Sequence, residues 1–117
     1  MNSLRLTTVA GALAVMATIA PAVAHADAAG YLFNITVRPG YHFGSGDAAV
    51  SYGYGICDKI HSGMAYGSLL TGIMNDQATD DNYQAAYLVN QAAEMLCPAE
   101  IWQLRQSAAH YSPPASP

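Results

Sequence analysis

The chain has 117 residues, of which 52% are hydrophobic and 10% are charged, and its formal net charge is −4. This length suits one small domain. The acidic balance excludes the basic surface that nucleic acids and anionic lipids require. Disordered chains combine a high charge with few aromatic residues, and this chain has neither property. These numbers predict a single folded domain, but they do not identify a molecular function.

The first 26 residues have the pattern of a secretory signal peptide. One positive charge, Arg5, precedes an apolar run over residues 6–20, and Pro21 ends that run. Small residues at Ala24 and Ala26 form a signal peptidase site; we expect cleavage after Ala26, with cleavage after Ala24 as the alternative. The run of about fifteen residues is shorter than the about 20 that span a bilayer. We therefore expect a secreted protein, extracellular or in the cell envelope, without a membrane anchor after cleavage.

Both cysteines, Cys57 and Cys97, follow the predicted cleavage site. Exported proteins meet an oxidising environment, in which an even number of cysteines predicts disulfide bonding. One intramolecular pairing is available, and closing its loop of about 40 residues gives about 4 kcal/mol of stability in the chain-entropy model. The sequence has no C-x-x-C motif and no further zinc ligands at a suitable spacing, so we expect a structural disulfide.

The expected folded domain covers residues 27–111, and a disordered Pro/Ser-rich tail follows over residues 112–117. Its first segment, residues 31–37, fits either a helix or a strand, because aromatic and β-branched residues occur with a helical apolar spacing. The sequence Arg-Pro-Gly at residues 38–40 ends this segment in either case. A loop rich in glycine and aromatic residues is expected over residues 41–46.

The next segment, residues 48–61, is predicted to be a helix that Asp47 caps. Helical spacing indicates an inward face made of Val50, Tyr54, Cys57 and either Ile60 or His61. Tyr52 would then be exposed on the opposite side. Gly53 lies one turn before Cys57, where the lack of a side chain lets another helix approach closely. The surrounding Gly-Tyr-Gly lacks the third glycine of a phosphate-binding loop.

Further helices are predicted in the second half of the chain. Gly63 ends the preceding helix, and apolar spacing predicts helices over residues 64–74 and 82–96. The second of these begins after Asp80 or Asp81, either of which can cap it. Their apolar faces consist of Tyr66, Leu69, Leu70 and Ile73, and of Ala85, Leu88, Val89, Ala92, Ala93 and Leu96.

Pro98 directly follows Cys97 and suits the first position of a final helix. Ile101, Leu104 and Ala108 line that helix, and Trp102 lies at its edge. No segment has a convincing pattern for a sheet. The sequence therefore predicts an all-α domain: a compact bundle of four or five short helices linked by one disulfide.

This pattern resembles a known family of small exported mycobacterial proteins called domain of unknown function 732. The resemblance lies in an aromatic or apolar pair opening a helix, a G-x-x-x-C-x-x-[apolar]-x-x-G motif and a helix ending in Cys-Pro. In this chain the residues are Tyr31 and Leu32, then Gly53, Cys57, Ile60 and Gly63, then Leu96, Cys97 and Pro98. The resemblance covers residues 27–104 and implies a compact, disulfide-linked helical domain. It implies no enzymatic activity, because none is established for the family.

Candidate metal ligands are sparse. The histidines at positions 42, 61 and 110 lack the spacing of a metal site. His61 near a helix C-terminus is explained by its favourable interaction with the helix dipole. We expect no metal site and no bound cofactor.

Candidate catalytic residues are equally sparse. Asp76, Asp80 and Asp81 share one polar turn, where we expect solvated or capping carboxylates instead of a catalytic pair. Ser45 stands between two glycines but lacks the strand-to-helix context of a nucleophile. We expect no catalytic residue and no enzymatic activity.

Aromatic side chains favour a role in binding. The candidate contact residues are Tyr41, Phe43, Tyr52 and Trp102, because tyrosine and tryptophan are enriched in binding hot spots. One hypothesis is a surface or host-exposed module for an unknown protein partner, and scattered surface aromatics remain the competing explanation. The alternative function is carriage of a lipid or haem, which requires an interhelical pocket lined by Leu, Met and Tyr. The sequence does not indicate the oligomeric state.

Overall fold

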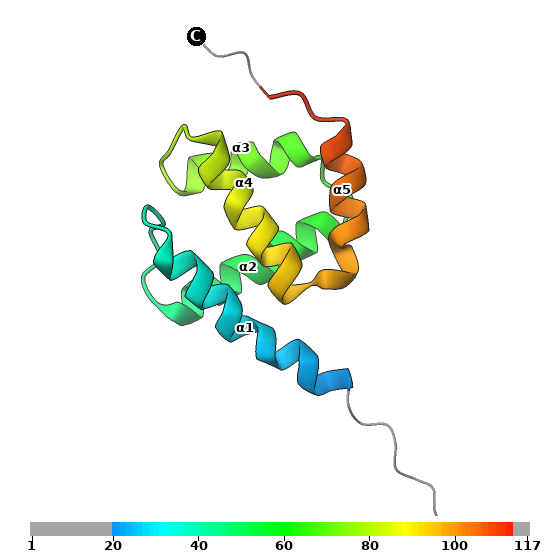
Figure 1. The fold of residues 1–117 in the computed structure, drawn as a ribbon. Helices are drawn as coiled ribbons and strands as arrows, with labels where there is room; N and C mark the ends of the chain where they lie inside the picture. Colours follow the sequence, from blue (N-terminus) through cyan, green and yellow to red (C-terminus); the bar gives the residue numbers. More distant parts are fainter. Residues whose placement is uncertain (1–19, 114–117) are drawn as a thin grey trace, which may run out of the picture.

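A computed structural model describes the backbone of residues 20–113 and the side chains of residues 28–113. Within this part of the chain there are five α-helices, a π-helical turn and a 3-10 turn, and no strand (Figure 1). The predicted all-α bundle is confirmed. The segment at residues 31–37, which fitted a helix or a strand, is part of helix α1 (Ala20–Val37).

The predicted signal peptide lies mostly outside the described residues, which exclude 1–19 and 114–117. The expected cleavage positions, Ala24 and Ala26, fall within the backbone of α1. Among the helices that the structure describes, none is long and apolar enough to cross a membrane.

Helix α2 (Gly46–His61) begins earlier than expected, and its cap is Ser45 instead of Asp47. The backbone of Ser45 is extended, and its hydroxyl accepts a hydrogen bond from the Ala48 amide at 3.1 Å. This is the geometry of an N-cap serine. Asp47 instead occupies the first turn, where its negative charge faces the positive end of the helix dipole.

The buried face of α2 is rotated from the predicted one. It consists of Ala49, Gly53, Ile56, Cys57 and Ile60. Tyr54 was expected to face inward, but its side chain is 43% exposed. His61 is also exposed. The prediction is confirmed for Cys57 and Ile60 and wrong for Tyr54. Glycine and tyrosine give this helix little contrast between apolar and polar positions, so its sequence pattern does not define one face.

Helix α4 (Asn82–Gln91) and the π-helical turn η1 (Ala92–Leu96) form the centre of the bundle (Figure 1). Between them they contact every other helix: α1, α2, α3 (Tyr66–Asp76) and α5 (Ile101–Ala109). Asp81 caps α4, since its Oδ1 atom accepts hydrogen bonds from the amides of Tyr83 and Gln84. The predicted apolar face is confirmed and buried: Ala85, Leu88, Val89, Ala92, Ala93 and Leu96.

The π-helical turn explains how two consecutive residues, Leu96 and Cys97, both face α2. The Cys97 amide donates a hydrogen bond to the Ala92 carbonyl at 3.2 Å, a spacing of five residues. In an α-helix, neighbouring side chains point roughly 100° apart. The wider turn rotates less per residue, so Leu96 reaches Gly53 while Cys97 reaches Cys57, one turn along α2.

The chain then leaves the bundle centre through Pro98. This residue opens a short 3-10 turn, η2 (Pro98–Glu100), as its fixed φ favours. Helix α5 follows and buries Leu104. The expected final helix is therefore confirmed, although its first turn is 3-10.

Candidate functional site

Three of the four predicted contact aromatics lie together in space. The ring centroids of Tyr41 and Phe43 are 6.5 Å apart, and those of Phe43 and Tyr52 are 5.4 Å apart. Tyr87 on α4 extends the group, with its ring stacked 6.5 Å from that of Tyr41. We call these four residues, Tyr87, Tyr41, Phe43 and Tyr52, the aromatic row. The row runs from α4, across the loop that connects α1 to α2, to α2 itself.

The fourth predicted residue, Trp102, is not part of the aromatic row. It lies on α5 with 71% of its surface exposed. The Arg105 guanidinium lies over its ring, 5.3 Å from the centroid. Sequence analysis missed Tyr87, although Tyr83 and Tyr87 are one helical turn apart in the sequence and this spacing indicates a shared face.

The prediction that Tyr52 is exposed is wrong, because its side chain is half-buried. The loop after α1 folds back over α2 and places Phe43 on the Tyr52 ring. The Tyr52 hydroxyl donates a hydrogen bond to Asp76 Oδ2 at 2.7 Å. Burial raises the pKa of Tyr52, and the hydrogen bond to Asp76 and its negative charge raise it further.

Two buried glutamines hold the loop that carries Tyr41 and Phe43. Gln77 is 4% exposed, and its Oε1 atom accepts a hydrogen bond from the His42 amide at 2.7 Å. Gln84 is 8% exposed, and its Oε1 atom accepts from Arg38 Nε at 2.8 Å. Its Nε2 atom donates to the Pro39 carbonyl at 3.0 Å. Glutamine is seldom buried, so the sequence pattern did not reveal these anchors.

The same loop depends on glycine at one position. Gly40 has a φ of +111°, in the region that side chains disfavour. A Cβ atom there would also lie 2.6 Å from Gln84 Nε2. A side chain at position 40 would therefore strain the backbone and collide with Gln84, so the turn requires glycine here.

Tyr41 is anchored to α4 through its hydroxyl group. Its hydroxyl donates a hydrogen bond to the Gln84 carbonyl at 2.7 Å. Burial raises the pKa of Tyr41 to about 12, although the nearby Arg38 charge acts in the opposite direction. The phenol therefore stays neutral at physiological pH and keeps its hydrogen bond.

An open groove of about 400 Å³ lies beside the aromatic row. Helix α1, the loop and the start of α2 form its walls, with Leu32, Thr36, Arg38, Tyr41, Phe43 and Ala49 among the lining residues. The Arg38 guanidinium lies 4.7 Å from the Tyr87 ring centroid. Two further hollows have volumes of about 240 and 560 Å³. The smaller lies between α5, η1 and the ends of α3 and α4, and the larger lies between α3 and the C-terminal segment.

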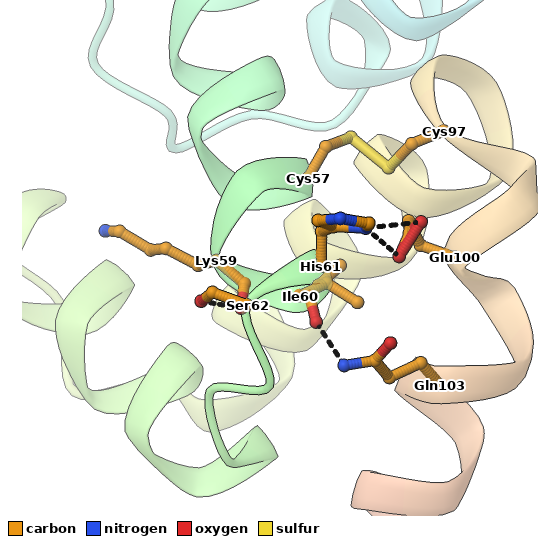
Figure 2. Close-up of polar contacts among 8 residues, drawn as sticks. All are labelled: Cys57, Lys59, Ile60, His61, Ser62, Cys97, Glu100 and Gln103. Atoms are coloured by element: carbon orange, nitrogen blue, oxygen red, sulfur yellow. Dashed lines mark hydrogen bonds and ion pairs between the residues drawn. A yellow bond between two sulfur atoms is a disulfide. The ribbon is translucent and has the colours of Figure 1, made fainter.

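The predicted disulfide joins α2 to the segment after η1 (Figure 2). The Cα atoms of Cys57 and Cys97 are 6.0 Å apart, within the normal range for a disulfide. Figure 2 also shows polar contacts close by. Gln103 Nε2 donates a hydrogen bond to the Ile60 carbonyl at 2.7 Å, and His61 Nδ1 lies 3.1 Å from Glu100. Because the His61 side chain is 79% exposed, we expect this pair to add little stability.

The other motif residues have structural roles. Gly53 is buried between Leu96 and Tyr31: a Cβ atom there would lie 2.5 Å from Leu96 Cδ1 and 2.8 Å from Tyr31 Cζ. The expected close approach at Gly53 is confirmed. Gly63 has a φ of +91° just after α2, which explains why the helix ends there.

The structure gathers few groups suited to metal chemistry. Among the described residues, no three His, Cys, Asp or Glu side chains are placed to hold a metal ion together. His42 is exposed in the loop of the aromatic row. His110 follows α5, and its Nδ1 atom lies 2.9 Å from the Gln106 carbonyl.

Comparison with known proteins gives one match. The family model described as a protein of unknown function (DUF732) matches residues 25–99. No curated protein and no solved structure matches the chain significantly. The matched range includes both cysteines, the glycine motif and the aromatic row. Because it covers well over half of the sequence, the chain belongs to the DUF732 family of proteins of unknown function.

Proposed function

We propose that this domain acts by binding a protein partner, and that the aromatic row is its contact surface. The observation that carries the proposal is the continuity of the row. Its four rings come from three separate parts of the chain, and each ring packs against the next one. Tyrosine-rich, partly buried clusters are typical of binding hot spots.

The support beneath the row favours this role. Association costs less entropy when the contact residues are already ordered. Gln77 and Gln84 hold the loop at three backbone or side-chain atoms, and the Tyr41 hydroxyl is bonded to the core. The rings therefore lie on a rigid base, which is the arrangement that a preorganised contact surface requires.

We also propose that the domain is exported and works outside the cytoplasm, at the cell surface or exposed to a host. The Cys57–Cys97 disulfide supports this location, because such bonds persist in oxidising compartments. The signal-like pattern of the first 26 residues supports it as well.

The alternative function, carriage of a lipid or haem inside the bundle, has less support. Such a carrier needs an enclosed pocket between helices. The hollow between α3, η1 and α5 has a volume of about 240 Å³, which is below the usual about 300–1,000 Å³ of small-ligand pockets. The other two described hollows are open grooves, and the centre of the bundle is filled by small and aliphatic side chains of α4 and η1. We propose binding at the surface, and binding instead of catalysis.

Site-specific photo-crosslinking in the producing cells tests the proposed contact. A photoreactive amino acid would replace His42, which is exposed between Tyr41 and Phe43. The matched control would replace Gln106, which is exposed on α5. We expect one discrete cross-linked protein from position 42, lost when Phe43→Ala is added. Equal cross-linking from both positions, or none from position 42, would contradict the proposal.

A further inference from the structure

Helix α1 carries apolar side chains on two of its faces. Tyr31 and Ile35 are buried in the bundle, whereas Phe33 is 66% exposed and Val37 is 61% exposed. Phe33 and Val37 are one helical turn apart, so they form a stripe on the outer side of α1. No charged residue occurs between positions 28 and 37. A helix that is apolar on opposite faces is normally covered on both, so the outer stripe points to a partner.

The open groove begins next to this stripe, at the edge of the bundle that α1 forms (Figure 1). Leu32 and Thr36 line the groove from α1, and Tyr41 and Phe43 line it from the loop. Phe33 and Thr36 are neighbours on the helix surface, because they are three residues apart. Polar and apolar groups line the groove in similar measure, which is close to the composition of a typical protein–protein contact. A protruding ring and a hollow of suitable composition therefore lie side by side on one surface.

This pair of features is self-complementary under two-fold symmetry. In a two-fold pairing the same surface patch of both copies meets itself. The Phe33 ring of each copy can then enter the groove of the other, which covers both rings and fills both grooves at once. A different partner would need its own ring and its own hollow at the same spacing, whereas a second copy of the chain has both.

The charges at the groove also suit this pairing. Arg38 lines one end of the groove. At the other end, a Cβ atom at Gly46 would lie 3.7 Å from Leu32 Cδ1, and Asp47 follows Gly46 in the first turn of α2. Leu32 and Arg38 are six residues apart, about 9 Å at the rise of a helix. Two antiparallel α1 helices therefore bring the Arg38 end of each copy towards the Asp47 end of the other. This attraction acts through space and needs no change in the bonds that Arg38 makes within its own chain.

We propose that two copies of this chain pair through α1, with the Phe33 ring of each copy seated in the groove of the other, between Thr36 and Phe43. This inference goes beyond the proposed function, because its surface is α1 and the groove, although Phe43 also belongs to the aromatic row. One helix face and one groove on each copy make a small contact, and small contacts are weak. The expected dissociation constant is about 10–100 μM.

The test measures the oligomeric state of the oxidised protein, purified from the cells that produce it. Sedimentation equilibrium gives the mass from about 1 μM to about 1 mM protein. Two-dimensional nuclear magnetic resonance over the same range shows which backbone amides move on dilution. Phe33→Ser removes the ring from the outer face of α1. Trp102→Ser is the matched control, because Trp102 is a similarly exposed aromatic residue, 71% exposed, on α5.

We expect the mass of the unaltered protein to rise from one copy to two, and the amides of residues 30–38 and 41–47 to shift with the same midpoint. Phe33→Ser should raise the dissociation constant by about tenfold or more, whereas Trp102→Ser should change it less than twofold. A protein that stays monomeric at about 1 mM would overturn the proposal, and this result needs no variant. Pairing that survives Phe33→Ser within twofold would also overturn it, as would dilution shifts confined to other helices.

The two proposals fail separately. Cross-linking from position 42 in a protein that stays monomeric leaves the proposed contact standing and removes the pairing. Pairing that Phe33→Ser disrupts, without any cross-linking from position 42, does the reverse.

Discussion

The ring of Tyr31 on α1 fills the space that a side chain at Gly53 on α2 would occupy. A Cβ atom at Gly53 would lie 2.8 Å from Tyr31 Cζ and 2.9 Å from its hydroxyl oxygen. That hydroxyl donates a hydrogen bond to the Ala49 carbonyl, one turn back on α2, at 3.0 Å. The two helices are thus joined by a buried ring that requires glycine opposite it.

Replacing Gly53 should therefore destabilise the fold. Gly53→Ala forces Tyr31 and Leu96 to move, and overpacking of this kind costs about 1–3 kcal/mol, which exceeds the gain of about 1 kcal/mol in helix propensity. Urea unfolding followed by circular dichroism measures the change. Gly55→Ala is the matched control: nothing lies within 4 Å of its added Cβ, so it should stabilise α2. A G53A variant as stable as G55A would contradict this packing.

The disulfide should supply a large share of the stability. Reduction of Cys57–Cys97 frees a loop with a sequence separation of 40 residues, which should lower the free energy of unfolding by about 4 kcal/mol. Urea unfolding with and without a reductant measures this loss. A C57A/C97A variant serves as the control, because the reductant should not change its stability. Free thiols in the native oxidised protein would disprove the linkage.

Alkaline pH should weaken the fold between about pH 10 and pH 12. Burial raises the pKa of Tyr41 from 10.0 to about 12, and it also raises the pKa of Tyr31. Since the folded state favours the neutral phenols, their contribution is complete below the unfolded pKa of about 10 and is lost as the pH rises towards the folded pKa. Unfolding measured at several pH values checks this. Tyr41→Phe should flatten the decline, and an unchanged slope would argue against the burial of this phenol.

The loop of the aromatic row should be sensitive at Gly40 and tolerant at Gly44. Gly40→Ala introduces a side chain at a φ of +111° and brings its Cβ to 2.6 Å from Gln84 Nε2. We expect a loss of about 1–3 kcal/mol from backbone strain. Gly44→Ala is the control, because nothing lies within 4 Å of its added Cβ. Thermal unfolding of both variants decides the point, and equal stability would show that the turn is not constrained.

The sequence alone predicted correctly those features that depend on residues close together along the chain. Helix periodicity along the chain predicted the buried face of α4 and η1, because that helix alternates clearly between apolar and polar residues. The capping role of Asp81 was one of two alternatives. The disulfide followed from the presence of two cysteines, for which one pairing exists.

Sequence analysis failed where position depends on distant contacts. His42 bonds to a residue 35 positions away, and Arg38 to one 46 positions away. Neither glutamine in these contacts, Gln77 or Gln84, carries a local pattern that marks it as buried. The exposure of Tyr52 was predicted wrongly for the same reason, because the loop that covers it comes from outside its own helix.

The sequence by itself thus determined the helices after residue 46, the buried face of α4 and η1, and the cross-link, because helix periodicity is local and two cysteines allow one pairing. Only the tertiary structure decided how the loop after α1 lies over α2 and α4. That packing brings Tyr41 and Phe43 between Tyr52 and Tyr87 and places the Arg38 guanidinium over the Tyr87 ring. The physical reason is that these groups meet through space and not along the chain, so no periodicity records their proximity.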